Sequence, residues 1–94
     1  MSQKYLRWIR QQPCAICEND QAVHAHHQIG SKTRGVGYKA SDFRVIPLCA
    51  PHHLELHNHG HITWEEIYGI TQDALIVNYL TQAISEGVLV CHTK

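Results

Sequence analysis

Residues 49–57 contain one cysteine and three histidines, a high density of side chains that bind metals. Thiolate sulfur and imidazole nitrogen are the usual zinc ligands in proteins. On a helix, side chains four residues apart share a face, whereas neighbours point about 100° apart. His53 and His57 can therefore bind one metal ion. Because His52 diverges from His57 by roughly 140°, we expect His52 to belong to a different site.

The first predicted site combines two pairs of ligands with the same spacing. Cys14 and Cys17 are separated by two residues, and so are Cys49 and His52. Three cysteines and one histidine form a tetrahedral set typical of structural zinc, with no open coordination position. The alternative for a lone Cys-x-x-Cys is a thioredoxin-like redox motif, which needs a surrounding βαβ pattern that is missing here. We therefore predict a structural zinc knuckle.

The second predicted site takes a third ligand from a short β-compatible segment, residues 23–29. Side chains alternate between the faces of a strand, so His26 points to one side and His27 to the other. We expect His26 to complete a metal site with His53 and His57. Such a site leaves positions open for water and substrate, as a catalytic metal requires. His27 would lie beside the metal, where an imidazole of pKa about 6.5 can act as a general base.

The remaining candidates receive simpler interpretations. A metalloprotease motif needs a glutamate directly after the first histidine, but Leu54 follows His53. Glu55 is accordingly expected to be exposed to solvent. The other histidines are interpreted as ordinary surface or core residues and the fourth cysteine as a free thiol: His24, His59, His61, His92 and Cys91.

The segment between the two predicted strands is rich in glycine and cations. Residues 30–42 hold three glycines together with Lys32, Arg34 and Lys39. Glycine lets the backbone approach a phosphate closely, and cations neutralise its charge. We assign DNA contacts to these three cations, with a flexible solvated loop as the alternative.

The elements that would position these side chains give an α+β fold. Two strands, residues 23–29 and 43–48, are expected to form a hairpin. Helices are expected over residues 2–12, from Pro51 to about 59, from about 63 to 68, and over residues 72–86. Proline, glycine and a capping-box pattern mark the helix ends: Pro13, Pro51, Gly60, Thr63, Glu66, Gly69 and Gly87.

Length and composition set the remaining limits. The 94 residues fit one domain, 1–94, and the 44% hydrophobic content argues against disorder. A core this small gains from a structural metal. No apolar run approaches the roughly 18 residues of a membrane span and no signal peptide is evident, so we expect a cytoplasmic protein whose cysteines bind metal. The net charge is zero, but the seven Lys/Arg of residues 1–44 leave that half basic, which permits one nucleic-acid-binding face.

Taken in order, these motifs resemble the HNH nucleases, also called ββα-metal or His-Me finger nucleases. The order is Cys-x-x-Cys, Ala-His-His, Asp-Phe-Arg-Val-Ile-Pro-Leu-Cys and Cys-x-x-His-His-x-x-x-His. The resemblance is strongest to the phage-type subgroup that includes the recombination-enhancement nuclease Ref, and it spans residues 4 to 90. It implies a hairpin and a helix around a divalent cation, with zinc, Mg²⁺ and Mn²⁺ as candidates. His27 matches the general base of the family, and His26, His53 and His57 match its metal ligands.

The resemblance implies a metal-dependent DNA endonuclease that hydrolyses phosphodiester bonds and leaves a 5′ phosphate. In the family an asparagine usually orients the base, and this chain offers Asp42 instead. Asp42 could accept a hydrogen bond from His27, lean toward the metal, or simply cap the loop. Ref-type proteins can carry a long basic N-terminal extension, whereas this chain starts at the domain, so dependence on a recombinase is not assumed.

Two other functions fit parts of the pattern. A non-catalytic, zinc-stabilised module that binds nucleic acid or protein would use only the Cys₃His site. A zinc hydrolase acting on a small molecule would require an apolar pocket, for which the sequence gives no signal. The metal content of the purified protein and a cleavage assay distinguish these functions from the nuclease.

Overall fold

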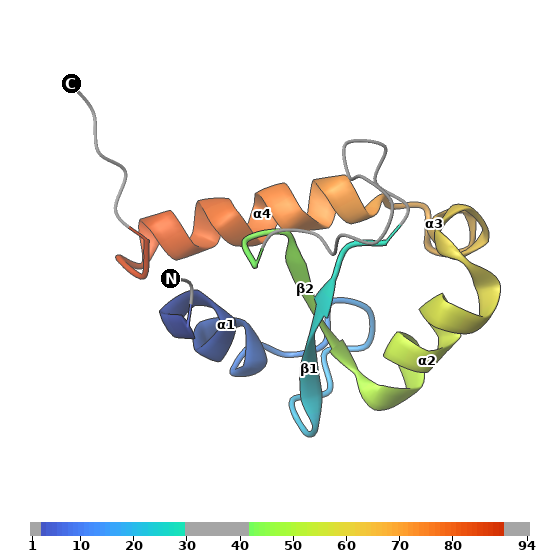
Figure 1. The fold of residues 1–94 in the computed structure, drawn as a ribbon, viewed down its shortest axis with the longest axis horizontal. Helices are drawn as coiled ribbons and strands as arrows, with labels where there is room; N and C mark the ends of the chain where they lie inside the picture. The colour runs from blue at the N-terminus through green and yellow to red at the C-terminus, as the bar shows by residue number, and fades with distance from the viewer. Residues whose placement is uncertain (1–2, 30–41, 90–94) are drawn as a thin grey trace.

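A two-stranded antiparallel sheet and four helices make up the computed structural model, which describes residues 3–29 and 42–89. The predicted α+β class is confirmed. The candidate DNA-contact residues Lys32, Arg34 and Lys39, together with Cys91 and His92, lie outside the described residues. The elements follow in the order α1 (Gln3–Arg10), β1 (Val23–His27), β2 (Val45–Cys49), α2 (Ala50–His59), α3 (His61–Tyr68) and α4 (Gln72–Ser85) (Figure 1).

The β1–β2 hairpin forms the centre of the molecule. Its register pairs Val23 with Cys49 and His27 with Val45. β2 is buried along its whole length, as expected for a strand covered on both faces. On β1, His26 is buried whereas His24, on the same face, is exposed. The predicted hairpin is therefore present, and β2 ends at Cys49, a residue of the predicted Cys₃His zinc site.

Glycines at positive φ separate the helices that follow the hairpin. Pro51 lies in the first turn of α2, as predicted, and the helix ends at Gly60, whose φ is 82°. Gly60 is also the N-cap of α3, so α3 begins at His61. The predicted capping box at Thr63 is therefore wrong, since Thr63 already lies inside the helix and no side chain caps it. Gly69, at φ 66°, ends α3 as predicted.

The last helix starts where the sequence indicates. Thr71 caps α4, its side-chain oxygen accepting a hydrogen bond of 3.0 Å from the amide of Ala74. The helix ends at Ser85 and is followed by Glu86 and by Gly87 at φ 80°. In the described part of the chain, no helix is long and apolar enough to cross a membrane.

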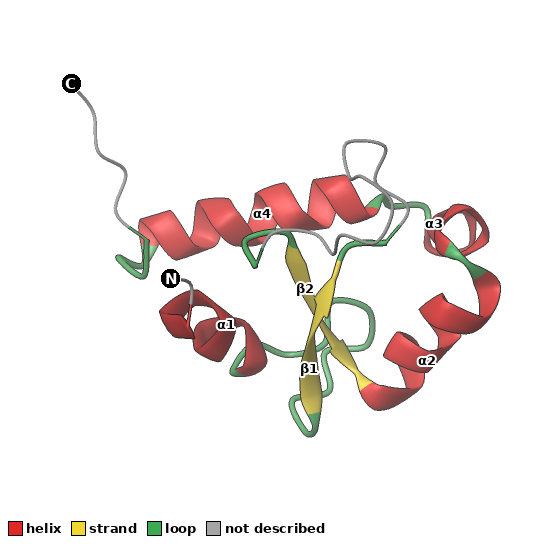
Figure 2. Cartoon of the chain, in the orientation of Figure 1, coloured by secondary structure: helices red, strands yellow, loops and turns green. Residues whose placement is uncertain are grey.

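Helices pack against the hairpin from different sides (Figure 2). α1 lies on one side of the hairpin, α2 and α3 lie on the other, and α4 runs across one end (Figure 1). One core cluster joins α1 to β2 and α4: Tyr5, Trp8, Ile9, Val45 and Ala83. The other joins β2 to α2, α3 and α4: Cys14, Ile46, Leu48, Cys49, Leu56, Trp64, Leu75 and Ile76. Two of the predicted zinc ligands are thus core residues.

Candidate metal centres

The first predicted site is assembled from three separate segments. Cys14 and Cys17 lie in the loop after α1, Cys49 ends β2, and His52 lies in the first turn of α2. One ligand atom from each of the four lies within 4.8 Å of the others. The four residues therefore sit close enough to hold one metal ion.

The distances between these ligand atoms match the edges of a zinc tetrahedron. Zinc–ligand bond lengths imply about 3.8 Å between two sulfurs and about 3.6 Å between a sulfur and a nitrogen. Cys17 Sγ lies 3.7 Å from Cys49 Sγ, and Cys14 Sγ lies 3.7 Å from His52 Nδ1. The Cys49 Sγ to His52 Nδ1 distance is shorter, at 3.1 Å. Cys14, Cys17 and Cys49 are free thiols without disulfides, so the donor set fits a metal and not a cross-link.

Backbone contacts fix the loop that carries the first cysteine pair. The amide of Ala15 donates to Pro47 O at 2.9 Å, which ties the loop to β2. The amide of Ile16 points at Cys14 Sγ from 3.4 Å. Burial raises the pKa of the Cys14 thiol, but hydrogen bonds from the backbone outweigh burial and the pKa is lowered overall. These contacts favour the thiolate of Cys14, the form that binds metal, whereas burial and the neighbouring thiols raise the pKa of Cys49.

The second predicted site brings β1 against α2. One ring nitrogen from each of His26, His53 and His57 lies within 4.8 Å of the others. The Nε2 atoms of His53 and His57 are 3.1 Å apart, close to the edge of about 3.3 Å that two zinc-bound imidazoles span. His26 is only 2% exposed, His53 is half-buried and His57 is exposed. The cluster is thus buried on the strand side and exposed to solvent on the helix side.

Burial favours the uncharged form of His26 and His53. It is the main reason that the pKa of His26 falls to about 4, and the charges of His53 and His57 lower it further. The pKa of His53 is also lowered, first by burial and then by His57 and His24. Neutral imidazole is the form that binds metal, so the lowered pKa values of His26 and His53 favour metal binding by these two residues at neutral pH.

His27 makes a contact that the sequence left open. Its Nε2 lies 2.8 Å from Asp42 Oδ1, with side-chain exposures of 26% and 38%. A carboxylate only accepts hydrogen bonds, so Nε2 is the donor and Nδ1 carries the lone pair of a neutral ring. Of the three alternatives for Asp42, the hydrogen bond to His27 is present in the structure.

Comparison with known proteins places this chain in a family. A family described as "Protein of unknown function (DUF968)" matches residues 1–87. The chain belongs to the DUF968 family. "Uncharacterized protein YdfU" of Escherichia coli K12 is 43% identical to it over 89 residues, which cover 95% of this chain. The alignment covers 25% of YdfU, so this DUF968 chain spans about a quarter of that relative's length. No solved structure matches.

Two residues that sequence reasoning left out lie against the candidate metal ligands of this DUF968 chain. His24 Nδ1 is 3.0 Å from His53 Nδ1, although we had interpreted His24 as an ordinary residue. Gln72, on α4, places its Oε1 3.3 Å from His26 Nε2. The alternation of β1 already put His24 on the face of His26 and could have indicated the first contact. Nothing in the sequence marks the second, because 46 positions separate the partners.

The expectation for Glu55 is also corrected. Glu55 is half-buried and accepts a hydrogen bond from the hydroxyl of Tyr68 on α3. This bond and the burial raise the pKa of Tyr68 to about 12. The contact joins α2 to α3, so Glu55 is only partly exposed to solvent. His59 is exposed, as the simpler interpretation requires, and His61 is half-buried.

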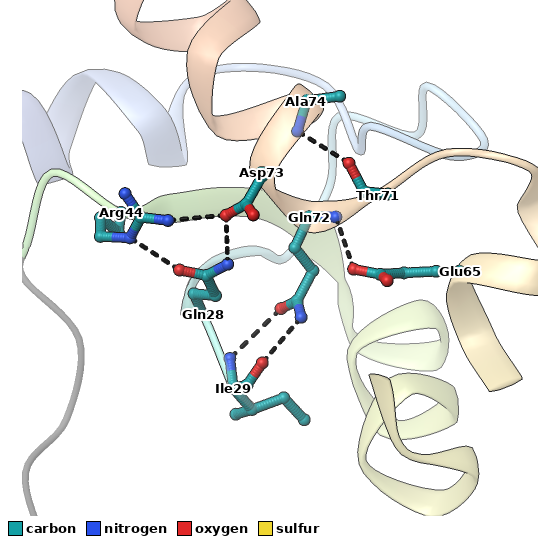
Figure 3. A network of polar contacts seen from close by, with 8 residues as sticks. All are labelled: Gln28, Ile29, Arg44, Glu65, Thr71, Gln72, Asp73 and Ala74. Atoms are coloured by element: carbon teal, nitrogen blue, oxygen red, sulfur yellow. Dashed lines mark hydrogen bonds and ion pairs between the residues drawn. The ribbon is translucent and has the colours of Figure 1, made fainter. Parts of the chain in front are cut away.

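A polar network holds the end of β1 against the start of α4 (Figure 3). Arg44 donates to Gln28 Oε1 at 2.7 Å and to Asp73 Oδ1 at 2.6 Å. Gln28 donates to the same Asp73 oxygen at 2.6 Å. The network lies directly after His27 in the chain and ties this segment to the start of α4.

Proposed function

We propose that this chain is a metal-dependent DNA endonuclease of the HNH type, with a ββα-metal core formed by β1, β2 and α2. One observation carries the proposal. His27, its Nε2 engaged by Asp42 at 2.8 Å, follows directly after a ligand of the three-histidine cluster. A fixed imidazole next to a metal site is the arrangement needed for hydrolysis by a general base.

The Cys₃His cluster is proposed to hold a structural zinc. Two of its four residues, Cys14 and Cys49, lie in the core cluster with Leu48 and Leu56, and the set joins the N-terminal loop to β2 and α2. In a chain of 94 residues the hydrophobic core is small, and four metal–ligand bonds would add to the stability of the fold. The four protein ligands leave no position for substrate, which suits a structural role.

The three-histidine cluster is proposed to hold the catalytic ion. Its imidazole nitrogens suit zinc and other late transition metals, whereas family resemblance adds Mg²⁺ and Mn²⁺. The chemistry that a bound divalent cation supplies is stabilisation of the negative charge that develops on the phosphate and on the leaving 3′ oxygen.

His27 is proposed to remove a proton from the attacking water. Asp42 accepts the hydrogen bond from Nε2, so the proton is taken up at Nδ1. The water oxygen then attacks phosphorus in line with the bond to the 3′ oxygen, and the product keeps its 5′ phosphate. The carboxylate of Asp42 stabilises the imidazolium that results.

The DNA is proposed to contact Lys32, Arg34 and Lys39. The resemblance to the phage-type subgroup extends the proposal to DNA processing during phage recombination, with a recombinase as a candidate partner. Single-domain organisation over 1–94 and a cytoplasmic location are parts of the same proposal.

Metal content and plasmid cleavage test this function together. We expect two metal ions per chain and nicking or linearisation of plasmid DNA in at least one of Zn²⁺, Mg²⁺, Mn²⁺, Co²⁺ and Ni²⁺. His57→Ala should remain folded, because His57 is exposed. It should lose one metal ion and cleavage, because it removes a proposed ligand of the catalytic ion. The matched control is His59→Ala, an exposed histidine on the same helix that should change neither property. One metal ion per chain and no cleavage with any of these ions would favour the non-catalytic zinc module.

A further inference from the structure

Gln72 is a buried polar side chain whose orientation is fixed by backbone groups. It is the first residue of α4 and is only 1% exposed. Its Nε2 donates to Ile29 O at 2.9 Å, and its Oε1 accepts from the amide of Ile29 at 3.3 Å (Figure 3). A backbone carbonyl can only accept and a backbone amide can only donate. The two contacts therefore decide which atom of the Gln72 side chain is the oxygen.

The same oxygen reaches a proposed metal ligand. Gln72 Oε1 lies 3.3 Å from Nε2 of His26. Because an amide oxygen only accepts, the hydrogen of this contact belongs to His26 Nε2. A neutral imidazole carries one ring hydrogen, so the lone pair of His26 is on Nδ1.

We propose that Gln72 is a positioning residue that holds His26 as the Nε2-protonated tautomer, so that His26 binds the metal ion through Nδ1. The inference rests on the proposed second metal site and names the ligand atom used there. Metal-binding histidines usually donate their other ring hydrogen to a carbonyl or carboxylate, which fixes the tautomer and the ring orientation. Here that acceptor comes from a helix that contributes no metal ligand.

Rigid contacts hold Gln72 in place for this role. Its own amide donates to Glu65 Oε2 of α3 at 2.8 Å. Thr71, the preceding residue, caps α4. A flip of the Gln72 amide would place like groups opposite both backbone atoms of Ile29, leaving a buried donor and a buried acceptor unpaired. The alternative tautomer of His26 is therefore disfavoured by contacts outside the metal site.

Gln28 supplies a matched control. It is also buried, at 5% exposed, and also ties the end of β1 to α4, through Asp73. The contacts that define its network do not include His26. Gln28→Leu should therefore lower stability without changing the tautomer of His26, whereas Gln72→Leu should change both.

The deciding measurement is NMR of protein loaded with ¹¹³Cd²⁺ and labelled with ¹⁵N at histidine. We expect one-bond coupling from the cadmium ion to Nδ1 of His26 and to Nε2 of His53. Coupling to Nε2 of His26 overturns this inference and leaves the proposed metal site standing. Absence of coupling to His26, His53 and His57 overturns the metal site and this inference with it. Neither readout depends on DNA cleavage.

Metal affinity separates positioning from a purely structural role. Gln72→Leu should weaken binding at the three-histidine site about 10- to 100-fold, the range for loss of an outer partner. Gln72→Glu keeps an acceptor for His26 but loses the donor to Ile29 O, so it should keep most of the affinity. Equal losses in Gln72→Leu, Gln72→Glu and Gln28→Leu would show that Gln72 acts only by holding the strand, and would overturn the proposal.

Discussion

Asp42 Oδ1 accepts a hydrogen bond from His27 Nε2 at 2.8 Å. This contact assigns the two ring nitrogens of His27 different tasks, since only Nδ1 remains to accept a proton. In the proposed reaction Asp42 therefore replaces the asparagine after which the HNH family is named.

Replacing Asp42 tests whether its carboxylate orients His27. Asp42→Leu should lower the cleavage rate about 100-fold, the scale expected when a catalytic group is misplaced by about 1 Å. Asp42→Asn should retain much of the rate, because the amide oxygen can accept the same hydrogen bond from Nε2. Single-turnover cleavage of a labelled duplex measures both variants. Equal rates in wild type and Asp42→Leu would exclude an orienting role.

Removal of a ligand of the proposed structural zinc site should unfold the protein. Cys14 is buried in the core and, with its three partners, would bind a structural zinc. We expect Cys14→Ser to lose one metal ion and its cooperative thermal transition, because metal binding and folding are coupled in such small sites. Circular dichroism with metal analysis measures both. A Cys14→Ser protein that lacks this zinc and melts like wild type would contradict the structural assignment.

His24 should influence the second site without being a ligand in it. Its Nδ1 lies 3.0 Å from His53 Nδ1, while His53 Nε2 faces His57. His24→Ala should therefore weaken metal binding at the three-histidine site about 10-fold through loss of an outer partner. Because His24 is exposed, its replacement should change little in the melting temperature of the protein when the second site holds no metal. Calorimetric titration of Mn²⁺ or Zn²⁺ gives the affinity, with His59→Ala as the control.

The lowered pKa of His26 predicts a dependence of stability on pH. Burial lowers this pKa from 6.5 to about 4 in the folded chain when the second site holds no metal. Between these values the unfolded chain binds a proton that the folded chain does not, so acid favours unfolding. Going from pH 7 to pH 5 should remove about 2 kcal/mol of stability. Denaturant unfolding at both pH values measures the loss, and His26→Asn should show a correspondingly smaller dependence.

Local geometry made the two clusters of cysteine and histidine predictable from sequence. The split between His52 and His53 follows from the angular spacing of a helix, and the separation of His26 from His27 follows from the alternation of a strand. Both depend only on the element type. The same local reasoning failed at Thr63, because Gly60 ends one helix and caps the next within a single residue.

Contacts between segments that are distant in the sequence could not be predicted from the local geometry of helices and strands. Gln72 meets His26 only because α4 runs back across the end of the hairpin (Figure 1). Glu55 is half-buried because α3 turns back toward α2 and presents Tyr68. In both cases the partner is set by the path of the chain through space. The predicted DNA contacts of Lys32, Arg34 and Lys39 stay predictions.

The central claim is that His27 is the general base of a metal-dependent nuclease. Plasmid cleavage by wild type, His27→Ala and His59→Ala, each with two metal ions bound, tests it most directly. We predict that His27→Ala keeps the metal content and melting temperature of wild type but cuts at least about 100-fold more slowly, as expected for loss of a general base. His59→Ala should cut at the wild-type rate. Cleavage by His27→Ala as fast as wild type would contradict the claim.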